Sequence, residues 1–178
     1  MSGQTDIRIV PTEASGEGAA GSVADTFGET VADTVAELNC TGYRLRKATR
    51  RVTALFDDAL APAGMTVTQF SILARLAVSG ASPMSGLADR MGMDASTLTR
   101  TLKPLLQRGL IEHSQGADRR VKHVVLTDEG KEAVALAVPY WRSAQQKVER
   151  ALGGEVSHLH SLLGRLSKAV DQDMGTGR

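Results

Sequence analysis

Apolar residues recur at helical spacing in two neighbouring segments, residues 84–91 and 95–106, with a short polar break between them. The first segment has one narrow apolar face. The second carries a leucine stripe made of Leu98, Leu102, Leu105 and Leu106. Asp94, at the end of the break, is a good N-cap for the second helix. Two helices joined by so short a turn, with hydroxyl and basic residues on the second, predict a helix-turn-helix.

The segment that follows the second helix predicts a hairpin. Gly109 stands where a helix ending at Arg108 needs a left-handed residue, as in a Schellman cap. Two β-prone runs follow within residues 111–126, separated by the turn-forming residues 114–118. A helix-turn-helix followed by a hairpin is a winged helix, which we expect over residues 63–127.

The segments on either side of this unit predict long amphipathic helices. Apolar residues alternate four and three apart in both, and Gly153-Gly154 breaks the second. Because one winged helix cannot bury seams of this length, we expect residues 31–62 and 128–172 to form a helical dimerisation region about a twofold axis. The expected fold class is mainly α with a small β wing. Residues 1–30, rich in Gly, Ala, Ser, Thr and Glu, are predicted to be a flexible tail.

Helix boundaries can also be predicted from single residues. Thr66 or Thr68 is expected to begin a helix, and Thr127 to cap the helix after the hairpin. Pro104 and Pro139 predict bends in their helices. In the helix that begins near residue 66, the residues expected to face inward are Phe70, Leu73, Leu76 and Ala77.

The charge of the whole chain does not favour a DNA partner, but the charge of one segment does. The 178 residues carry a formal net charge of +1, whereas Ser85 to Lys122 holds seven basic and four acidic residues. Affinity for DNA depends on such a local field more than on net charge. No apolar run approaches the roughly 18 residues of a membrane span, no signal-peptide layout is present, and the single cysteine fits a reducing compartment. We therefore expect a cytoplasmic protein without a membrane partner.

Enzyme and metal chemistry find little support in the sequence. There is no nucleophile motif, no phosphate-binding glycine loop and no paired-carboxylate motif. His158 and His160 are two apart on a predicted helix and therefore point to different faces. We expect no catalytic residues, no metal site and no cofactor.

The run from Ser85 to Thr127 resembles the MarR (multiple-antibiotic-resistance regulator) family of winged-helix transcription factors. The similarity rests on LADRMGMDASTLTRTLKPLLQRGLI and on ADRRVKHVVLTDEG, which shows the family's wing pattern of Asp, an Arg two residues on, and then Leu-Thr-x-x-Gly. It covers most of the chain after the predicted tail. The resemblance implies a homodimer that binds a pseudo-palindromic operator in double-stranded DNA, as a repressor rather than an activator.

The first turns of the second helix hold the residues expected to contact DNA: Ser96, Thr97, Thr99, Arg100 and Lys103. Short hydroxyl side chains allow close approach to the groove and are expected to donate to phosphates or base edges, and the Arg100 guanidinium can form a fork onto guanine. Lys103 is expected to meet a phosphate. On composition alone the same residues also fit an ordinary solvated helix face.

The predicted wing carries a second group of candidate contacts. By the family's register, the resemblance implies that Arg120 reaches the minor groove, while Arg119 would meet the backbone. The carboxylate of Asp118 would hold the Arg120 guanidinium in place through a bidentate pair. The alternative is a charged turn with no role in DNA binding.

Family members often bind aromatic or phenolic effectors, and Tyr43, Phe70, Leu73 and Trp141 are the candidate lining of such a site here. The alternative is that these side chains belong to the core. Cys40, close to a basic run, is either a thiol-based redox sensor, as in one branch of the family, or a small buried hydrophobe.

Two function classes therefore stay open. The first is a homodimeric, sequence-specific regulator released from DNA by a small-molecule effector. The second is a winged-helix module for protein interaction or architecture, with weak DNA contact.

Overall fold

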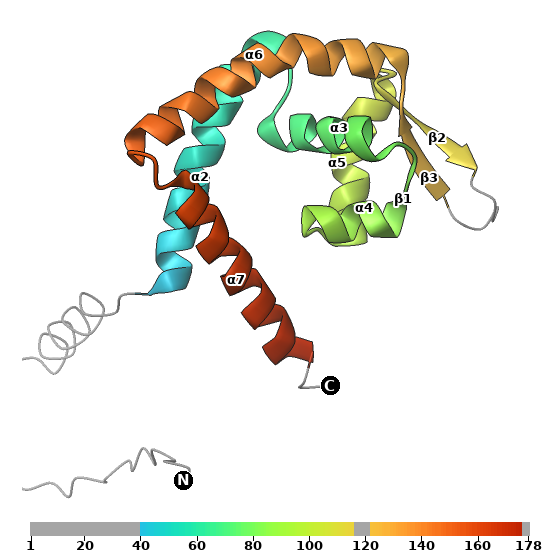
Figure 1. Cartoon of the computed structure of the whole chain (residues 1–178). Coiled ribbons are helices and arrows are strands. Elements are labelled where there is room, and N and C mark those ends of the chain that lie inside the picture. The colour runs from blue at the N-terminus through green and yellow to red at the C-terminus, as the bar shows by residue number, and fades with distance from the viewer. Residues whose placement is uncertain (1–39, 116–121, 176–178) are drawn as a thin grey trace, which may run out of the picture. The chain divides into compact units, whose positions relative to one another are not determined.

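The computed structural model describes residues 40–115 and 122–175, which are mainly helical with a small sheet, as predicted (Figure 1). The helices are α2 (Thr41–Leu60), α3 (Val67–Ser79), α4 (Met84–Met91), α5 (Ala95–Gln107), α6 (Asp128–Ala151) and α7 (Val156–Gly175), with a short 3-10 helix at Ala61–Ala63. The strands are β1 (Ser82–Pro83), β2 (Ile111–Gln115) and β3 (Lys122–Leu126).

The chain divides into two compact units, residues 1–45 and 46–178. Of the first unit, only residues 40–45, at the beginning of α2, are described. The expected tail at residues 1–30 and the first part of the expected N-terminal seam lie outside the described residues. Within the described ranges, none of the helices combines the length and the apolar character needed to cross a membrane.

The predicted hairpin is present and belongs to a three-stranded antiparallel sheet with the order β1-β3-β2. Its strands run further than predicted: Ser114 and Gln115, expected in the turn, pair with β3, because the antiparallel register continues to the Gln115–Lys122 pair. Strand β1 was not predicted. It is an edge strand of two residues, where Pro83 is tolerated because an edge does not need its missing N–H donor.

Helix α3 begins at a capping box, in which Thr66 and Gln69 each accept a hydrogen bond from the other's backbone N–H. This confirms Thr66 as the cap. The prediction for Ala77 was wrong, because Ala77 is exposed and Ile72 is buried instead. The buried residues of α3 lie at positions 70, 72, 73 and 76, so the inward stripe ends one residue before Ala77.

The hydrophobic core joins every element of the helix-turn-helix to α6. Its fully buried side chains include Leu60, Ile72, Leu73, Leu76, Leu87, Leu98, Leu102, Leu105, Ile111 and Val124. Each buried leucine of this size contributes about 1.5–3 kcal/mol relative to an exposed one. Because α5 supplies three of them, its orientation is determined by the core.

Helix α5 ends in the predicted Schellman cap. Gly109 has a φ of 66°, its N–H donates to the Leu106 carbonyl at 3.0 Å, and the Leu110 N–H donates to the Leu105 carbonyl at 3.0 Å. The Arg108 guanidinium donates to the Gly64 carbonyl at 2.7 Å, which ties the end of α5 to the corner before α3. The helix continues through Pro104.

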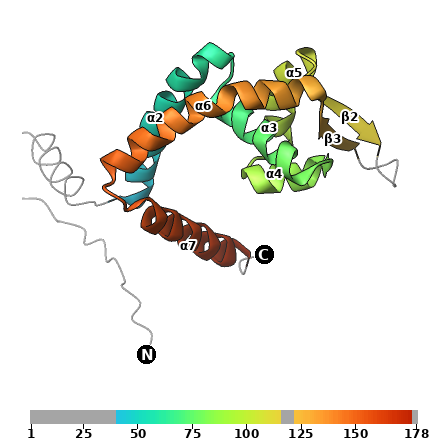
Figure 2. The same cartoon turned by 45° about the horizontal axis from the view of Figure 1, so that its top comes forward.

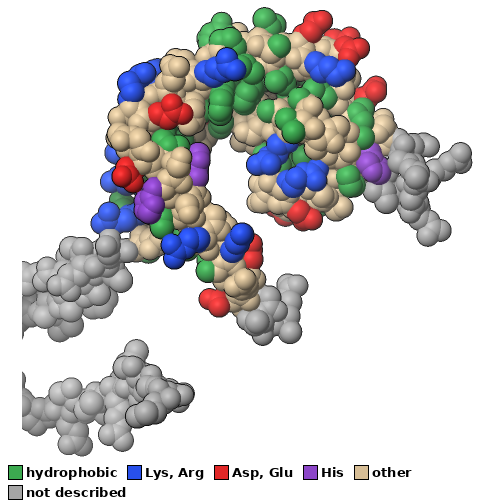
Figure 3. All heavy atoms as spheres, in the orientation of Figure 1, with side chains coloured by type: hydrophobic (Ala, Val, Ile, Leu, Met, Phe, Trp, Pro, Cys, Tyr) green, Lys and Arg blue, Asp and Glu red, His purple; other side chains and the backbone are tan. Residues whose placement is uncertain are grey.

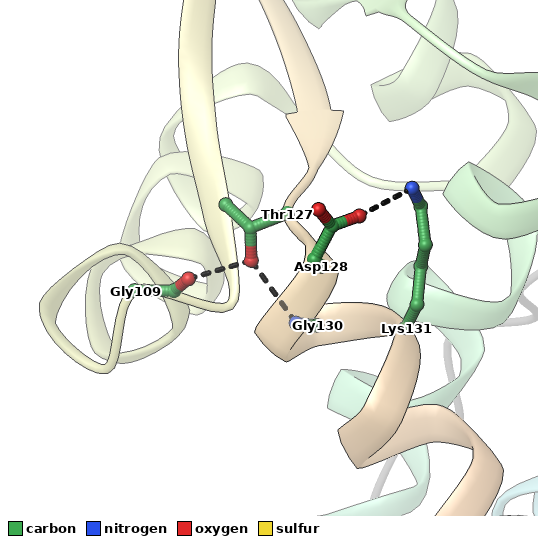
Figure 4. A network of polar contacts seen from close by, with 5 residues as sticks. All are labelled: Gly109, Thr127, Asp128, Gly130 and Lys131. Atoms are coloured by element: carbon green, nitrogen blue, oxygen red, sulfur yellow. Dashed lines mark hydrogen bonds and ion pairs between the residues drawn. The ribbon is translucent and has the colours of Figure 1, made fainter.

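A polar joint connects this end of α5 to the start of α6 (Figure 4). The Thr127 hydroxyl donates to the Gly109 carbonyl at 2.7 Å and accepts from the Gly130 N–H at 3.0 Å. The Thr127 N–H donates to the Leu110 carbonyl at 3.2 Å. Thr127 is therefore the predicted N-cap of α6 and also the link to the preceding helix.

Gly130 allows α6 to approach this joint closely. A Cβ at position 130 would overlap the Leu110 carbonyl oxygen and would lie 2.6 Å from Leu126 Cδ1. These neighbours are a backbone carbonyl and a packed strand residue, neither of which can move aside easily. The glycine of the Leu-Thr-x-x-Gly pattern is thus required by packing.

Helix α6 runs from the wing strands to α7 and packs against α3 on the way (Figures 1 and 2). It continues through Pro139 and ends before Gly153 and Gly154, both of which have positive φ. The predicted break and restart of the chain are confirmed, with α7 beginning at Val156.

Replacing Gly130 with Ala should destabilise the protein strongly, by about 3 kcal/mol or more, since a clash with backbone exceeds ordinary overpacking. The measurement is the free energy of unfolding from urea titration. Gly86→Ala is the matched control, because a Cβ there meets only ordinary contacts at 3.6 Å and 3.7 Å. Comparable losses in the two variants would contradict the packing role of Gly130.

Candidate nucleic-acid interface

The first turn of α5 is organised by the carboxylate of Asp94. Its oxygens accept hydrogen bonds from the Ser96 hydroxyl at 2.5 Å, the Thr97 N–H at 2.8 Å and the Thr97 hydroxyl at 2.7 Å. Asp94 has the extended backbone of an N-cap, as predicted. Side-chain donation from Ser96, and then from Thr97, holds the pKa of the Asp94 carboxyl well below its ordinary value. The group is therefore ionised at neutral pH.

The outer face of α5 carries the predicted polar residues. Ser96, Thr99, Arg100 and Lys103 are exposed, and Thr97 is half-buried. The opposite face holds the buried leucines of the core. The structure thus brings all the described candidates of this helix onto one accessible surface.

Besides Ser96 and Thr97, two more of these side chains, Thr99 and Arg100, have hydrogen-bond partners on α5 itself. The Thr99 hydroxyl donates to the Ala95 carbonyl at 2.8 Å. The Arg100 guanidinium donates to the Ser96 carbonyl oxygen and to the Ser96 hydroxyl, each at 3.3 Å. Sequence reasoning treated the hydroxyl groups as donors to DNA and missed these internal bonds. The sequence did contain a signal for these bonds, because each of the two side chains lies four residues after the residue that accepts its hydrogen.

The wing candidates Asp118, Arg119 and Arg120 lie outside the described residues. The strands that lead to them are described, and their pairing continues to Gln115 and Lys122. On the face drawn in Figure 3, acidic and basic side chains are interspersed, in keeping with a net charge of +1.

A pocket of about 410 Å³ lies between α3, α4 and α6. Phe70 and Trp141, two of the predicted lining residues, both line it, and their rings stack with centroids 5.9 Å apart. The ring of Phe56 also lies near that of Trp141, with their centroids 6.4 Å apart. Leu73 is fully buried in the core and does not line this pocket. Tyr43 is 57% exposed and belongs to the other unit of the chain.

Two arginines that sequence reasoning did not select, Arg75 and Arg90, also line the pocket. The Arg90 guanidinium donates to the Ser82 hydroxyl at 2.8 Å. Ser82 is only 2% exposed and pairs with Val124 in β3. The pocket therefore combines an aromatic wall with two cationic groups, one of which is bonded to the sheet.

Cys40, the first residue that the structure describes, is exposed in the single chain. Among the described residues, His, Cys, Asp and Glu form no group of three or more that would hold a metal ion.

The sequence of the chain matches a known protein family. A sequence model of the MarR family matches residues 65–122. The HTH-type transcriptional repressor NicR of Pseudomonas putida is 30% identical, over 76% of this chain and 85% of its own length. The chain belongs to the MarR family. As a MarR-family member it is a DNA-binding transcriptional regulator and not an enzyme.

Solved MarR-type structures match the fold over nearly their full length. The M. tuberculosis transcriptional regulator MosR in complex with DNA has 39% identity and a TM-score of 0.66, covering 74% of this chain and 98% of MosR. A structure of Bordetella bronchiseptica BpsR concerns regulation of its DNA binding by 6-hydroxynicotinic acid. It has 28% identity and a TM-score of 0.66, covering 74% of this chain and 95% of BpsR.

Proposed function

We propose that the protein is a homodimeric, sequence-specific repressor that reads its operator with the exposed face of α5. The observation that carries the proposal is the division of this helix between a buried leucine stripe and an exposed polar face. A helix held by the core on one side can present the other to a major groove. The likeness to MosR, which was solved in complex with DNA, supports the same use of the helix here.

The side chains have different roles in this proposal. Arg100 forks onto a guanine edge, and Lys103 meets a phosphate. In the wing, Arg120 enters the minor groove with its guanidinium held by Asp118, and Arg119 meets the backbone. The sign of regulation follows the relative NicR, which is a repressor.

Dimerisation is supported by the apolar face of α7. Five of its side chains form one helical stripe and are 37–47% exposed in the single chain: Leu159, Leu162, Leu163, Leu166 and Val170. A contiguous apolar stripe of this length is unusual on the surface of a monomer and is typical of an interface. A second copy of the chain is the occupant that the proposal assigns to it, because a twofold pair also presents two α5 helices to one operator.

An effector site is supported by the pocket beside Trp141. The stacked rings of Phe70 and Trp141 suit an aromatic ring, and Arg75 and Arg90 suit an acidic group on it. BpsR, whose DNA binding is regulated by 6-hydroxynicotinic acid, supports an effector of this type. An effector releases DNA only if it binds one conformation of the dimer better than the other.

Competition binding on DNA from upstream of the protein's own operon tests the regulator proposal. A regulator should prefer that DNA over random duplex by at least about 10³. A protein-interaction or architectural module should show no such preference.

Arg100→Ala should weaken binding to the specific DNA by about 1–3 kcal/mol and leave binding to random duplex nearly unchanged. Lys103→Ala, the control, should weaken both about equally. Equal losses for Arg100→Ala on both DNAs would remove this residue from base reading.

The proposed dimer can be tested by analytical ultracentrifugation, in which the protein should sediment with twice the chain mass of 18.8 kDa. Leu163→Glu should raise the dimer dissociation constant at least about 100-fold, because two buried leucines are lost per dimer at about 1.5 kcal/mol each. Ser161→Glu, on the opposite side of α7, is the matched control and should leave the dimer intact. Equal effects of the two variants would mean that the stripe is not the interface.

Titration with 6-hydroxynicotinate, benzoate and phenol should change the fluorescence of Trp141, the single tryptophan of the chain. The two acids should bind more tightly than phenol because of the arginines. Arg75→Met should reduce that difference, since only Arg90 then remains, and should preserve the binding of phenol. If none of the three compounds alters either the fluorescence or the DNA affinity, the pocket is not an effector site for this class.

A further inference from the structure

The N-terminus of α5 is already occupied by an anion that belongs to the chain. Helix N-termini bind phosphates because their first N–H groups lack partners and carry partial positive charge. Here the Asp94 carboxylate accepts the Thr97 N–H at 2.8 Å and lies at that end of the helix. A DNA phosphate that approached the same place would meet a like charge, and the Thr97 N–H would already be engaged by the carboxylate.

The carboxylate also determines what the hydroxyl groups can offer. The hydrogens of Ser96 and Thr97 are both donated to Asp94, at 2.5 Å and 2.7 Å. Thr99 donates its hydrogen to a backbone carbonyl in the same way. Each hydroxyl therefore presents lone pairs to the groove, and its partner there must be a donor.

Phosphates and base amino groups of DNA interact differently with the first turn of α5. Phosphate oxygens are acceptors only, so they gain nothing from hydroxyls whose hydrogens are engaged. The exocyclic amino groups of adenine and cytosine are donors on the major-groove edge. A helix whose first turn repels phosphates, while its hydroxyl groups accept hydrogen bonds from amino groups, has a lower affinity for DNA in general and keeps its affinity for a sequence that places those amino groups opposite the hydroxyls.

We propose that Asp94 is a specificity-determining residue, which excludes backbone phosphate from the N-terminus of α5 and orients Ser96 and Thr97 as acceptors toward base edges. The inference rests on the proposed reading of DNA by α5 and adds the origin of its selectivity. Arg100 belongs to the same network, because it donates to the Ser96 hydroxyl that Asp94 orients.

Asp94→Asn is the test variant, because Asn caps helices about as well as Asp, removes the charge and replaces one acceptor oxygen with an NH2 group. Its amide nitrogen can no longer accept a hydroxyl hydrogen, so one hydroxyl becomes a donor again. The affinity for random duplex should rise about tenfold, since a like-charge repulsion is relieved. The slope of log K against log salt should steepen by about 0.9 for each additional phosphate that the variant neutralises.

Asp89→Asn is the matched control. Asp89 is an exposed carboxylate on α4, in the same lobe, so the variant makes the same change in net charge without touching the first turn of α5. It should leave the ratio of specific to random affinity close to that of the wild type. The ratio in Asp94→Asn should fall by about tenfold.

The outcomes separate the two proposals. If the wild type shows no preference for its operator, the proposed function fails. If the wild type is selective and Asp94→Asn behaves like Asp89→Asn, only the role of Asp94 is overturned. Thermal melting by circular dichroism confirms folding of each variant. Asp94→Ser, which keeps an N-cap hydroxyl without charge, carries the test if the Asn variant does not fold.

Discussion

The joint between α5 and α6 is the constraint on which the rest of the structure depends. The hydroxyl of one side chain, Thr127, donates to the Gly109 carbonyl just after α5 and accepts the Gly130 N–H in the first turn of α6. The absence of a side chain at Gly130 lets the two backbones come together. Because α6 also carries Trp141 and leads on to α7, this joint fixes how α5 is connected to the pocket wall and to the helix that carries the apolar stripe.

Other corners of the lobe are held in a similar way, by a long or polar side chain bonded to a neighbouring element. The Asp57 carboxylate accepts the Val67 N–H at 2.6 Å and ties α2 to α3. Arg108 reaches the Gly64 carbonyl, and Arg90 reaches the buried Ser82. The bonds of Asp57 and Arg90 also satisfy partly buried polar groups, which would be costly to leave without a partner. The helix-turn-helix is therefore held by its leucine core and by polar anchors at its turns.

Features that depend on residues close together in the chain could be predicted from sequence. Features that depend on contacts between distant segments could not. The bounds of α4, the Asp94 cap and the Schellman cap at Gly109 depend on residues within one turn of each other. Strand β1 exists only because β3 lies beside it, and the burial of Ile72 in place of Ala77 depends on neighbouring helices. For the candidate site, the residues of α5 were identified correctly as an exposed face, but their internal hydrogen bonds were not foreseen. The wing arginines rest on the family resemblance alone.

The separation of the two faces of α5 has an evolutionary consequence. Residues such as Thr99 and Lys103 contribute little to the core, so exchanging them alters the exposed face of α5 at small cost in stability. The pocket between α3 and α6 lies elsewhere in the lobe and is untouched by such exchanges. On the proposed reading of DNA by α5, one copy of a duplicated gene can therefore move to a new operator through a few surface substitutions and inherit its pocket unchanged. New regulatory circuits arise easily from a scaffold built in this way.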